Sequence, residues 1–266
     1  MKTQSNRYDL IIEAIFDEHY RAGVSDFYFE RDEFIGKAET LGLERPRNLG
    51  DLLYTYRYRK ALPAAITETA PPGYAWIIRG AGHGRYQFAL VRDLAISPDP
   101  AMLKIKIPDA TPGVISKYAM SDEQALLAKL RYNRLIDIFT GLTCYSLQSH
   151  LRTTVEGVGQ VETDELYIGL DKRGAHTIIP VQAKGGRDKI GAVQIEQDIA
   201  MCAAKFPGLI CRPVAAQFVD DGVIALFEFV DAAPGEIAIS SQRHYRLVKP
   251  EDLSLEEQKQ YQHLQF

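Results

Sequence analysis

The sequence has few cysteines, little net charge and no long apolar run. Its three cysteines lie far apart and form no Cys-x-x-Cys pair, which argues against a disulfide framework and against a zinc knuckle. No stretch approaches the roughly 18 consecutive apolar residues that a membrane-spanning helix needs, and the N-terminus contains no apolar signal region. We therefore expect a cytoplasmic protein that has no contact with a membrane.

The charge balance excludes one class of nucleic-acid-binding protein but not all of them. The 266 residues carry a net charge of −4, which argues against a chain that coats nucleic acid nonspecifically. Net charge averages over the faces of a molecule, so a local basic surface remains possible. A hydrophobic content of 46% and a charged content of 25% are ordinary for a globular protein, which excludes fibrous and disordered classes.

The first third of the chain is predicted to form three helices and a hairpin. Apolar residues recur at helical spacing over residues 8–21 and 31–43, and a third helix is expected to begin after Asn48, which is a good N-cap. The apolar face of this third helix consists of Leu49, Leu52, Leu53 and Tyr56. Two strands at 74–80 and 85–91 flank a glycine-rich turn, which favours a hairpin.

Three helices followed by a hairpin is the element order of a winged-helix DNA-binding module. In such a module the third helix lies in the major groove and the hairpin reaches the flanking backbone. Basic and aromatic side chains suit these contacts, and the candidates are Arg45, Arg47, Tyr54, Thr55, Arg57, Arg59, Lys60 and Arg85. The alternative is a solvated basic surface beside an aromatic core. We expect a winged-helix-like α+β domain over residues 1–95 and a connector with one short strand over 96–120.

The remainder, residues 121–266, is expected to form a separate α/β domain. Apolar spacing and turn residues predict helices over 121–141 and 143–155, strands over 160–170 and 176–184, a helix over 188–206, strands over 210–219 and 223–230, and a polar helix in the tail after 254. This order indicates a mixed central sheet flanked by helices.

Alternation along the two middle strands decides which charged side chains point together. Residues two apart share a face of a strand, so Glu162 and Asp164 are expected to project together, as are Gln182 and Lys184. The opposite row of the first strand consists of Val161, Thr163, Glu165 and Tyr167. If the strands pair as a hairpin, Asp164 lies near Gln182 and Lys184, whereas a slip of one residue would separate them.

Such a group of side chains suits metal-assisted hydrolysis of a phosphodiester. Mg²⁺ prefers oxygen ligands, which Asp164, the side-chain oxygen of Gln182 and the carbonyl of Ala183 offer. Lys184 is placed to orient the attacking water and to offset charge that develops on phosphorus. The alternative is that these residues form ordinary ion pairs at the end of a sheet.

The same residues resemble the core of the PD-(D/E)XK nuclease superfamily. Thr163-Asp164 stands where that family has Pro-Asp, and Gln182-Ala183-Lys184 stands where it has acid-x-Lys, with a glutamine as in the Gln-x-Lys variant of Mrr-type restriction enzymes. The order of predicted helices and strands over residues 122–231 agrees with this resemblance. It implies a restriction-endonuclease-like fold and a Mg²⁺-dependent nuclease.

The neutral Gln182 requires another acid, because Mg²⁺ affinity depends on the charge of its ligands. Glu162 is the first candidate, both as a metal ligand and as a catalytic residue. Glu196 is the second, since some restriction enzymes carry the missing acid on the helix that follows the lysine, and Glu165 is the third. Two further polar residues of the predicted preceding helix, Gln148 and Arg152, lie beside the expected site or on the surface.

The two halves together resemble a restriction endonuclease, in which one domain reads DNA and the other cuts it. We expect a Mg²⁺-dependent enzyme that acts on double-stranded DNA as a homodimer, so that two sites address two strands. Two alternatives stay open. One is a repair or branched-DNA nuclease of the same superfamily, and the other is a DNA-binding regulator whose nuclease-like core is inactive, for which Gln182 is the argument.

Overall fold

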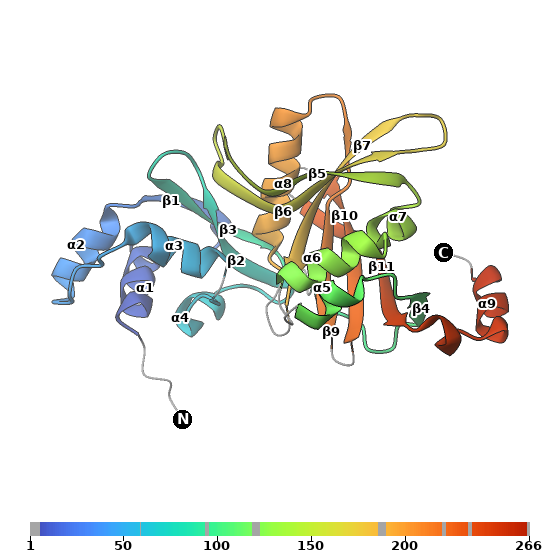
Figure 1. Ribbon diagram of the computed structural model, residues 1–266. Helices are drawn as coiled ribbons and strands as arrows, with labels where there is room; N and C mark the ends of the chain where they lie inside the picture. Colours follow the sequence, from blue (N-terminus) through green and yellow to red (C-terminus); the bar gives the residue numbers. More distant parts are fainter. Residues whose placement is uncertain are drawn as a thin grey trace.

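The computed structural model describes residues 6–58, 60–93, 96–118, 123–185, 190–219, 222–233 and 236–264. The chain forms a small N-terminal unit, up to residue 93, and a larger unit built on a curled mixed sheet, from residue 96 onwards. Figure 1 shows the N-terminal helices at one end of the molecule and the C-terminal helix at the other. No helix in the described ranges is long and apolar enough to cross a membrane.

The N-terminal unit contains the three predicted helices and the predicted hairpin. Its elements are α1 (Arg7–His19), β1 (Asp26–Glu30), α2 (Glu33–Thr40), α3 (Leu49–Tyr58), α4 (Ala64–Thr67), β2 (Tyr74–Gly80) and β3 (Arg85–Arg92). The strands form an antiparallel sheet in the order β1-β3-β2. The strand β1 and the short α4 were not predicted. Asn48 caps α3 as expected, because its Oδ1 accepts a hydrogen bond from the main-chain N–H of Asp51 at 3.1 Å.

Aromatic side chains form the core of the N-terminal unit. Phe16 of α1 lies edge-on to Trp76 and Phe88, with ring centres 5.2 Å apart in both pairs. Phe29 of β1 packs on Phe88, which explains why β1 forms: its alternate residues turn a phenylalanine toward this cluster. The predicted apolar face of α3 is confirmed, since Leu52, Leu53, Tyr56 and the partly buried Leu49 all belong to the same core.

The larger unit contains a mixed sheet flanked by helices, as predicted. Its elements are β4 (Lys104–Pro108), α5 (Gly113–Tyr118), α6 (Glu123–Tyr132), α7 (Leu135–Thr140), β5 (Thr143–Val155), β6 (Gly159–Leu170), β7 (His176–Lys184), α8 (Ala192–Lys205), β8 (Ile210–Cys211), β9 (Val214–Val219), β10 (Val223–Ala233), β11 (Glu236–Val248) and α9 (Leu255–Gln262). The order of strands is β4-β11-β10-β9-β7-β6-β5, with β8 beside β7. Strand β7 runs parallel to β9 and antiparallel to β6.

Helices cover both faces of this sheet (Figure 1). On one face, Leu126 and Leu130 of α6 pack against Val181 of β7. On the other face, Met201 of α8 packs against Ile178 of the same strand. Successive residues of β7 belong alternately to the two clusters, as expected for a strand that is buried on both faces.

The predicted helix over 143–155 is wrong, because this segment is the strand β5. It pairs with β6 from Thr143 opposite Leu170 to Val155 opposite Gly159. Three threonines, a tyrosine and a valine in this segment favour a strand, and the helical spacing of Leu147 to the next leucine was coincidental. The side chain of Leu147 is largely exposed, so it buries no helical face.

Two further differences concern the helix over 121–141 and the unpredicted strand β11, whereas the short connector strand and the tail helix were predicted. The predicted helix over 121–141 is divided into α6 and α7 at Arg134, whose φ of 50° is left-handed. The predicted connector contributes the short strand β4, which pairs in parallel with the unpredicted β11 at one edge of the sheet. The predicted tail helix is confirmed as α9, with Ser254 as its N-cap.

The two units touch where β2 meets the turn between β5 and β6. A Cβ atom added at Gly80 would overlap the main-chain carbonyl oxygen of Val158, so only glycine allows this approach. Beside it, the guanidinium of Arg79 binds both carboxylate oxygens of Glu196 on α8, with Nε 2.7 Å from Oε2. The contact between the units is therefore close and polar.

We predict that Gly80→Ala lowers the free energy of unfolding by about 1–3 kcal/mol, the usual cost of overpacking a tight contact. Gly36→Ala is the matched control, because Gly36 lies inside α2 with open space around it, and alanine there should gain up to about 1 kcal/mol. Urea unfolding of both variants is the measurement. Equal midpoints for Gly80→Ala and wild type would show that the two units do not approach closely at this point.

Candidate active site

Asp164 and Lys184 lie at the point where β6 and β7 separate. The regular pairing of these strands ends at Glu165 opposite Val181. Beyond this pair, the main-chain N–H of Ala183 donates to the Asp164 carboxylate, with N and Oδ2 2.8 Å apart. The side chain of Asp164 thus takes a hydrogen bond that would otherwise continue the ladder, and this fixes the carboxylate beside the predicted Gln-Ala-Lys segment.

Burial raises the pKa of Asp164 above its ordinary value. The hydrogen bond from Ala183 and the charge of Lys184 oppose this effect, the charge of Glu123 adds to it, and His150 contributes a smaller attraction. Within the described residues, Oδ1 of Asp164 has no hydrogen-bond donor. The carboxylate is therefore held by one oxygen and keeps the other for an incoming group.

Glu123 is a site residue that the sequence did not indicate. It lies in the first turn of α6, and its Oε1 is 3.1 Å from Nζ of Lys184. The lysine side chain is only 13% exposed, so the ion pair fixes its ammonium group. An acid in the first turn of a helix is common for reasons of helix polarity alone, and only the tertiary structure brings this one to Lys184.

Gln182 faces α8 and is buried. Its amide nitrogen donates to Oδ2 of Asp198 at 2.9 Å and to the main-chain oxygen of Glu162 at 3.1 Å. Its amide oxygen accepts from Gln194 at 3.4 Å. The polar ends of Gln182 and Lys184 therefore point to different helices, which corrects the expectation that they are aimed at one spot.

Asp198 is the acid that contacts Gln182. It is fully buried, and its Oδ1 accepts a hydrogen bond from Thr163 Oγ1 at 2.5 Å. Burial raises the pKa of Asp198 to about 7; the hydrogen bonds from Thr163 and Gln182 oppose the shift, and the nearby charge of Asp164 adds to it. The charges of Asp164, Lys184 and Asp198 thus act on one another, although Asp198 belongs to the helix layer.

The predicted alternation along β6 is wrong at Asp164. Thr163 bonds Asp198 on α8, whereas Glu165 bonds Arg131 of α6 on the other face of the sheet. These two residues were expected to share a face. The strand changes faces between them, so Asp164 lies at an irregularity of β6, where strand pairing is disrupted and a side chain can be re-aimed.

All three acids proposed as substitutes for the missing carboxylate are held by arginines. The pairs are Glu162 with Arg152 at 3.0 Å, Glu165 with Arg131 at 2.6 Å, and Glu196 with Arg79. Arg152 and the exposed Gln148 both lie on the strand β5 and not on the helix that was predicted for them. The acids near Asp164 that could take the compensating role are instead Glu123 and Asp198.

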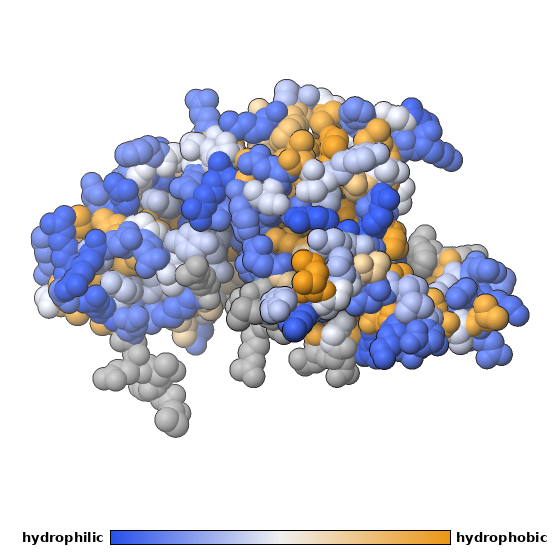
Figure 2. Space-filling view, viewed as in Figure 1, coloured by the Kyte–Doolittle hydropathy of each residue, from blue (hydrophilic) through white to orange (hydrophobic). Residues whose placement is uncertain are grey.

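Three of the predicted DNA-binding cations are exposed on the N-terminal unit. Arg45 precedes α3, the side chain of Arg47 is 88% exposed, and Arg85 begins β3 with its guanidinium 4.3 Å from the centre of the Tyr28 ring. Tyr54 of α3 is partly exposed. Figure 2 shows this end of the molecule as largely hydrophilic.

Other predicted DNA-binding residues are engaged within the protein. Nζ of Lys60 lies 2.5 Å from the carboxylate of Asp9. Arg57 is half-buried over two tyrosine rings, at 4.9 and 5.9 Å from their centres. The hydroxyl of Thr55 donates to a carbonyl one turn earlier in α3. Arg59 lies outside the described residues.

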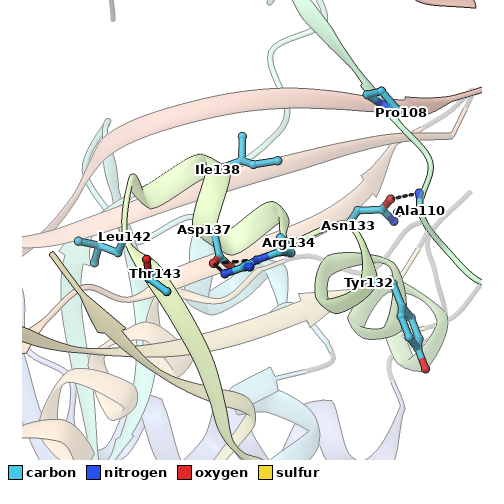
Figure 3. Close-up of a pocket in the computed structure, with 9 residues that line it drawn as sticks. All are labelled: Pro108, Ala110, Tyr132, Asn133, Arg134, Asp137, Ile138, Leu142 and Thr143. Atoms are coloured by element: carbon cyan, nitrogen blue, oxygen red, sulfur yellow. Dashed lines mark hydrogen bonds and ion pairs between the residues drawn. The ribbon is translucent and has the colours of Figure 1, made fainter. Parts of the chain in front are cut away.

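One cavity is separate from these side chains. It has a volume of about 490 Å³ and opens beside α7 (Figure 3). Its polar groups bond within the protein: Asn133 accepts from the N–H of Ala110 at 2.7 Å, and Arg134 pairs with Asp137. None of the predicted site residues lines it.

In the described parts of the chain, a single group of at least three acids, histidines or cysteines has its ligand atoms close enough together to share a metal ion. It consists of Glu18, His19 and Glu33 on α1 and α2. Glu18 pairs with Lys37 at 2.6 Å, and His19 bonds Glu33 at 2.7 Å. These internal contacts satisfy the group without an ion.

Comparison of the chain with protein family models, with curated proteins and with solved structures finds no match. The chemistry of the site therefore has to be inferred from its own residues.

We predict that Asp198 makes stability fall as pH rises through neutrality in metal-free buffer. Its pKa of about 7 in the folded protein lies above the ordinary value of 3.8, so between these values the folded protein binds more protons than the unfolded chain. The free energy of unfolding falls by up to about 1.4 kcal/mol per pH unit where the folded protein holds one proton that the unfolded chain has released. Urea unfolding of wild type and Asp198→Asn from about pH 5 to about pH 7.5 measures it, because the asparagine cannot titrate.

Asp171→Asn is the control for this titration. Asp171 lies in the turn between β6 and β7, and hydrogen bonds from Ala175 and Arg173 lower its pKa, so it stays ionised over the same pH range. This variant should follow wild type in parallel. Parallel curves for Asp198→Asn and wild type would contradict the raised pKa.

Proposed function

We propose that this protein is a Mg²⁺-dependent DNA endonuclease of restriction type. The observation that carries the proposal is the group formed by Asp164, Lys184 and Glu123 where β6 and β7 separate, with Asp198 behind it. An acid on one strand, a lysine on the next and further acids on the flanking helices are the groups that phosphodiester hydrolysis requires.

The acids of the site are of the chemical type that a hard divalent cation binds. Glu123, Asp164 and Asp198 are three acids around one ammonium group, that of Lys184. The raised pKa values of Asp164 and Asp198 have burial as their main cause, and neighbouring carboxylates add to it, as expected of a site short of positive charge. We assign Asp164, Glu123 and the carbonyl of Ala183 as the oxygen ligands of Mg²⁺.

Gln182 acts differently from the ligand that the sequence suggested. Its amide oxygen is directed to Gln194 and its amide nitrogen to Asp198. We therefore assign Gln182 to holding the buried acid of α8 beside the site, where it contributes negative charge. An acid at position 182 would lie within hydrogen-bond distance of Asp198 and would repel it.

The remaining chemistry is assigned to Lys184 and the metal. When bound, Mg²⁺ would supply a Lewis acid for the phosphate and an acidified water. The ammonium of Lys184, oriented by Glu123, would position the attacking water and offset the negative charge that develops on phosphorus. Because Lys184 is largely shielded from solvent, its charge acts through a medium of low polarity and is weakly screened.

The order of elements supports a restriction enzyme with two parts. The hairpin of β6 and β7, the crossover helix α8 and the parallel β9 agree with the restriction-endonuclease-like core that the sequence resembles. In the N-terminal unit, three helices and a small antiparallel sheet agree with a winged-helix-like module that reads DNA. A homodimer is proposed because two strands have to be cut.

We expect cleavage of plasmid DNA that requires Mg²⁺ and Lys184. Lys184→Ala and Glu123→Gln should each lower the single-turnover rate by at least about 10²-fold, since they remove charge stabilisation and a metal ligand. Glu162→Gln is the matched control, because the carboxylate of Glu162 is held by Arg152 and should be dispensable. Methylated and unmethylated plasmid are digested side by side, with Mg²⁺ or with a chelator.

Each alternative has its own outcome in this experiment. Cleavage only at junctions or flaps would indicate a repair nuclease. Tight DNA binding without cleavage, with every metal and methylation state, would indicate an inactive regulator and would refute the assigned chemistry. Loss of cleavage in Glu162→Gln with full activity in Glu123→Gln would return the compensating role to Glu162.

The exposed arginines before α3 and on β3 should contact DNA phosphates. Arg47→Ala and Arg85→Ala should each weaken binding in Ca²⁺ and lower the slope of log K against log salt by about 1, because each removes one phosphate contact. Arg173→Ala, in the turn between β6 and β7, removes an arginine that is 81% exposed, similar to Arg47, and serves as the control. An unchanged salt slope in both arginine variants would remove this surface from the DNA interface.

A further inference from the structure

His150 lies opposite Asp164 on the neighbouring strand. The flanking pairs of β5 and β6 are Ser149 with Glu165 and Leu151 with Thr163, which puts His150 and Asp164 directly across from each other. The same histidine lies near enough to Asp164 to lower the pKa of that carboxyl. A side chain of β5 is thus part of the surroundings of the catalytic carboxylate.

The backbone of His150 is left-handed at the point where the pairing of β5 and β6 is irregular. Its φ is 50°, in the left-handed region that side chains rarely adopt. In the described ranges, Arg134 is the other non-glycine residue with a positive φ, and it lies at the junction of α6 and α7, where the chain turns. His150 lies inside a strand that pairs on both sides of it. Strain of this kind is concentrated at functional sites, where the surrounding structure holds it.

The imidazole ring is oriented by the residue next to Glu123. Nε2 of His150 lies 2.7 Å from the amide nitrogen of Gln124. When the amide nitrogen of Gln124 donates, Nε2 is the acceptor and Nδ1 carries the proton of the neutral ring. The charged ring, which lowers the pKa of Asp164, carries a proton on both nitrogens, so Nδ1 is a donor in either form. His150 is exposed, and Nδ1 has no hydrogen-bond partner among the described residues. The ring therefore presents a fixed N–H donor to solvent beside the acids of the site.

A phosphodiester is the ligand that this donor fits. Its oxygens only accept hydrogen bonds, and the acids around Asp164 repel it, so a further donor is needed in addition to Lys184. Lys184 is already bound to Glu123. The exposed position of His150 is accessible to a substrate as large as DNA.

We propose that His150 is a further catalytic residue that donates a hydrogen bond from Nδ1 to a non-bridging oxygen of the phosphate that is cut. This inference rests on the proposed nuclease function and adds a residue to its site. It also gives a reason for the left-handed backbone. In a regular strand the side chain of residue 150 would point in another direction and would lose the contact with Gln124.

Three variants test the proposal. His150→Gly removes the donor and relieves the strain, so it should raise or maintain the urea midpoint, lower the single-turnover rate with Mg²⁺ by about 10²-fold and weaken DNA binding in Ca²⁺ several-fold. His150→Asn should keep the rate within about tenfold of wild type, because its amide nitrogen can occupy the position of Nδ1 and asparagine tolerates a positive φ. Arg134→Gly relieves strain away from the site and should change neither rate nor affinity.

The outcomes separate this inference from the function on which it rests. Wild-type rate and affinity in His150→Gly would overturn the role of His150 and leave the nuclease intact. A large fall of the urea midpoint in His150→Gly would also overturn it, because the residue would then be structural. If wild type cleaves no DNA, the nuclease proposal fails, and the affinity in Ca²⁺ alone decides whether His150 contacts DNA: an unchanged affinity in His150→Gly refutes the contact.

Discussion

The buried hydrogen bond between Gln182 and Asp198 joins the central strand β7 to α8, and the arrangement of the site depends on it. The carboxylate of Asp198 is fully buried, and burial without hydrogen-bond donors would be unfavourable. Gln182 and Thr163 supply these donors. Because Thr163 lies on β6, the acid ties both strands of the hairpin to one helix. This fixes the rotation of α8 about its own axis relative to the sheet.

The fixed rotation of α8 determines how the two units meet. Successive residues of a helix are turned by about 100°, so Glu196 and Asp198, two positions apart, point in nearly opposite directions. With Asp198 on the sheet, Glu196 faces outward and binds Arg79 of β2. The next residue, Gln197, accepts a hydrogen bond from the hydroxyl of Tyr58 in α3 at 2.8 Å. One turn of α8 therefore contacts the hairpin of β6 and β7 on one side and the N-terminal unit on the other.

The sequence was informative where a local pattern decides the structure and uninformative where packing decides it. The strands β6 and β7 and the proximity of Asp164 to the Gln-Ala-Lys segment followed from alternation and from the turn between them. The helix α8 was also predicted, but its rotation was not, so Glu196 was selected and Asp198, two residues later, was missed. Glu123 was missed because no spacing rule connects the start of α6 to a strand sixty residues away.

The same distinction explains why Glu162, Glu165 and Glu196 were considered for the compensating role before Glu123 and Asp198. A sequence shows where carboxylates are, but it does not show which of them are neutralised. Glu162, Glu165 and Glu196 each have an arginine, and a carboxylate in such a pair has little left to offer a cation. Asp198 has only neutral donors among its hydrogen-bond partners, and Glu123 shares its lysine with Asp164. Asp198 and Glu123 therefore carry the negative charge that a metal would balance, because neither has a cation of its own. Only the folded structure shows which acids lack such a partner.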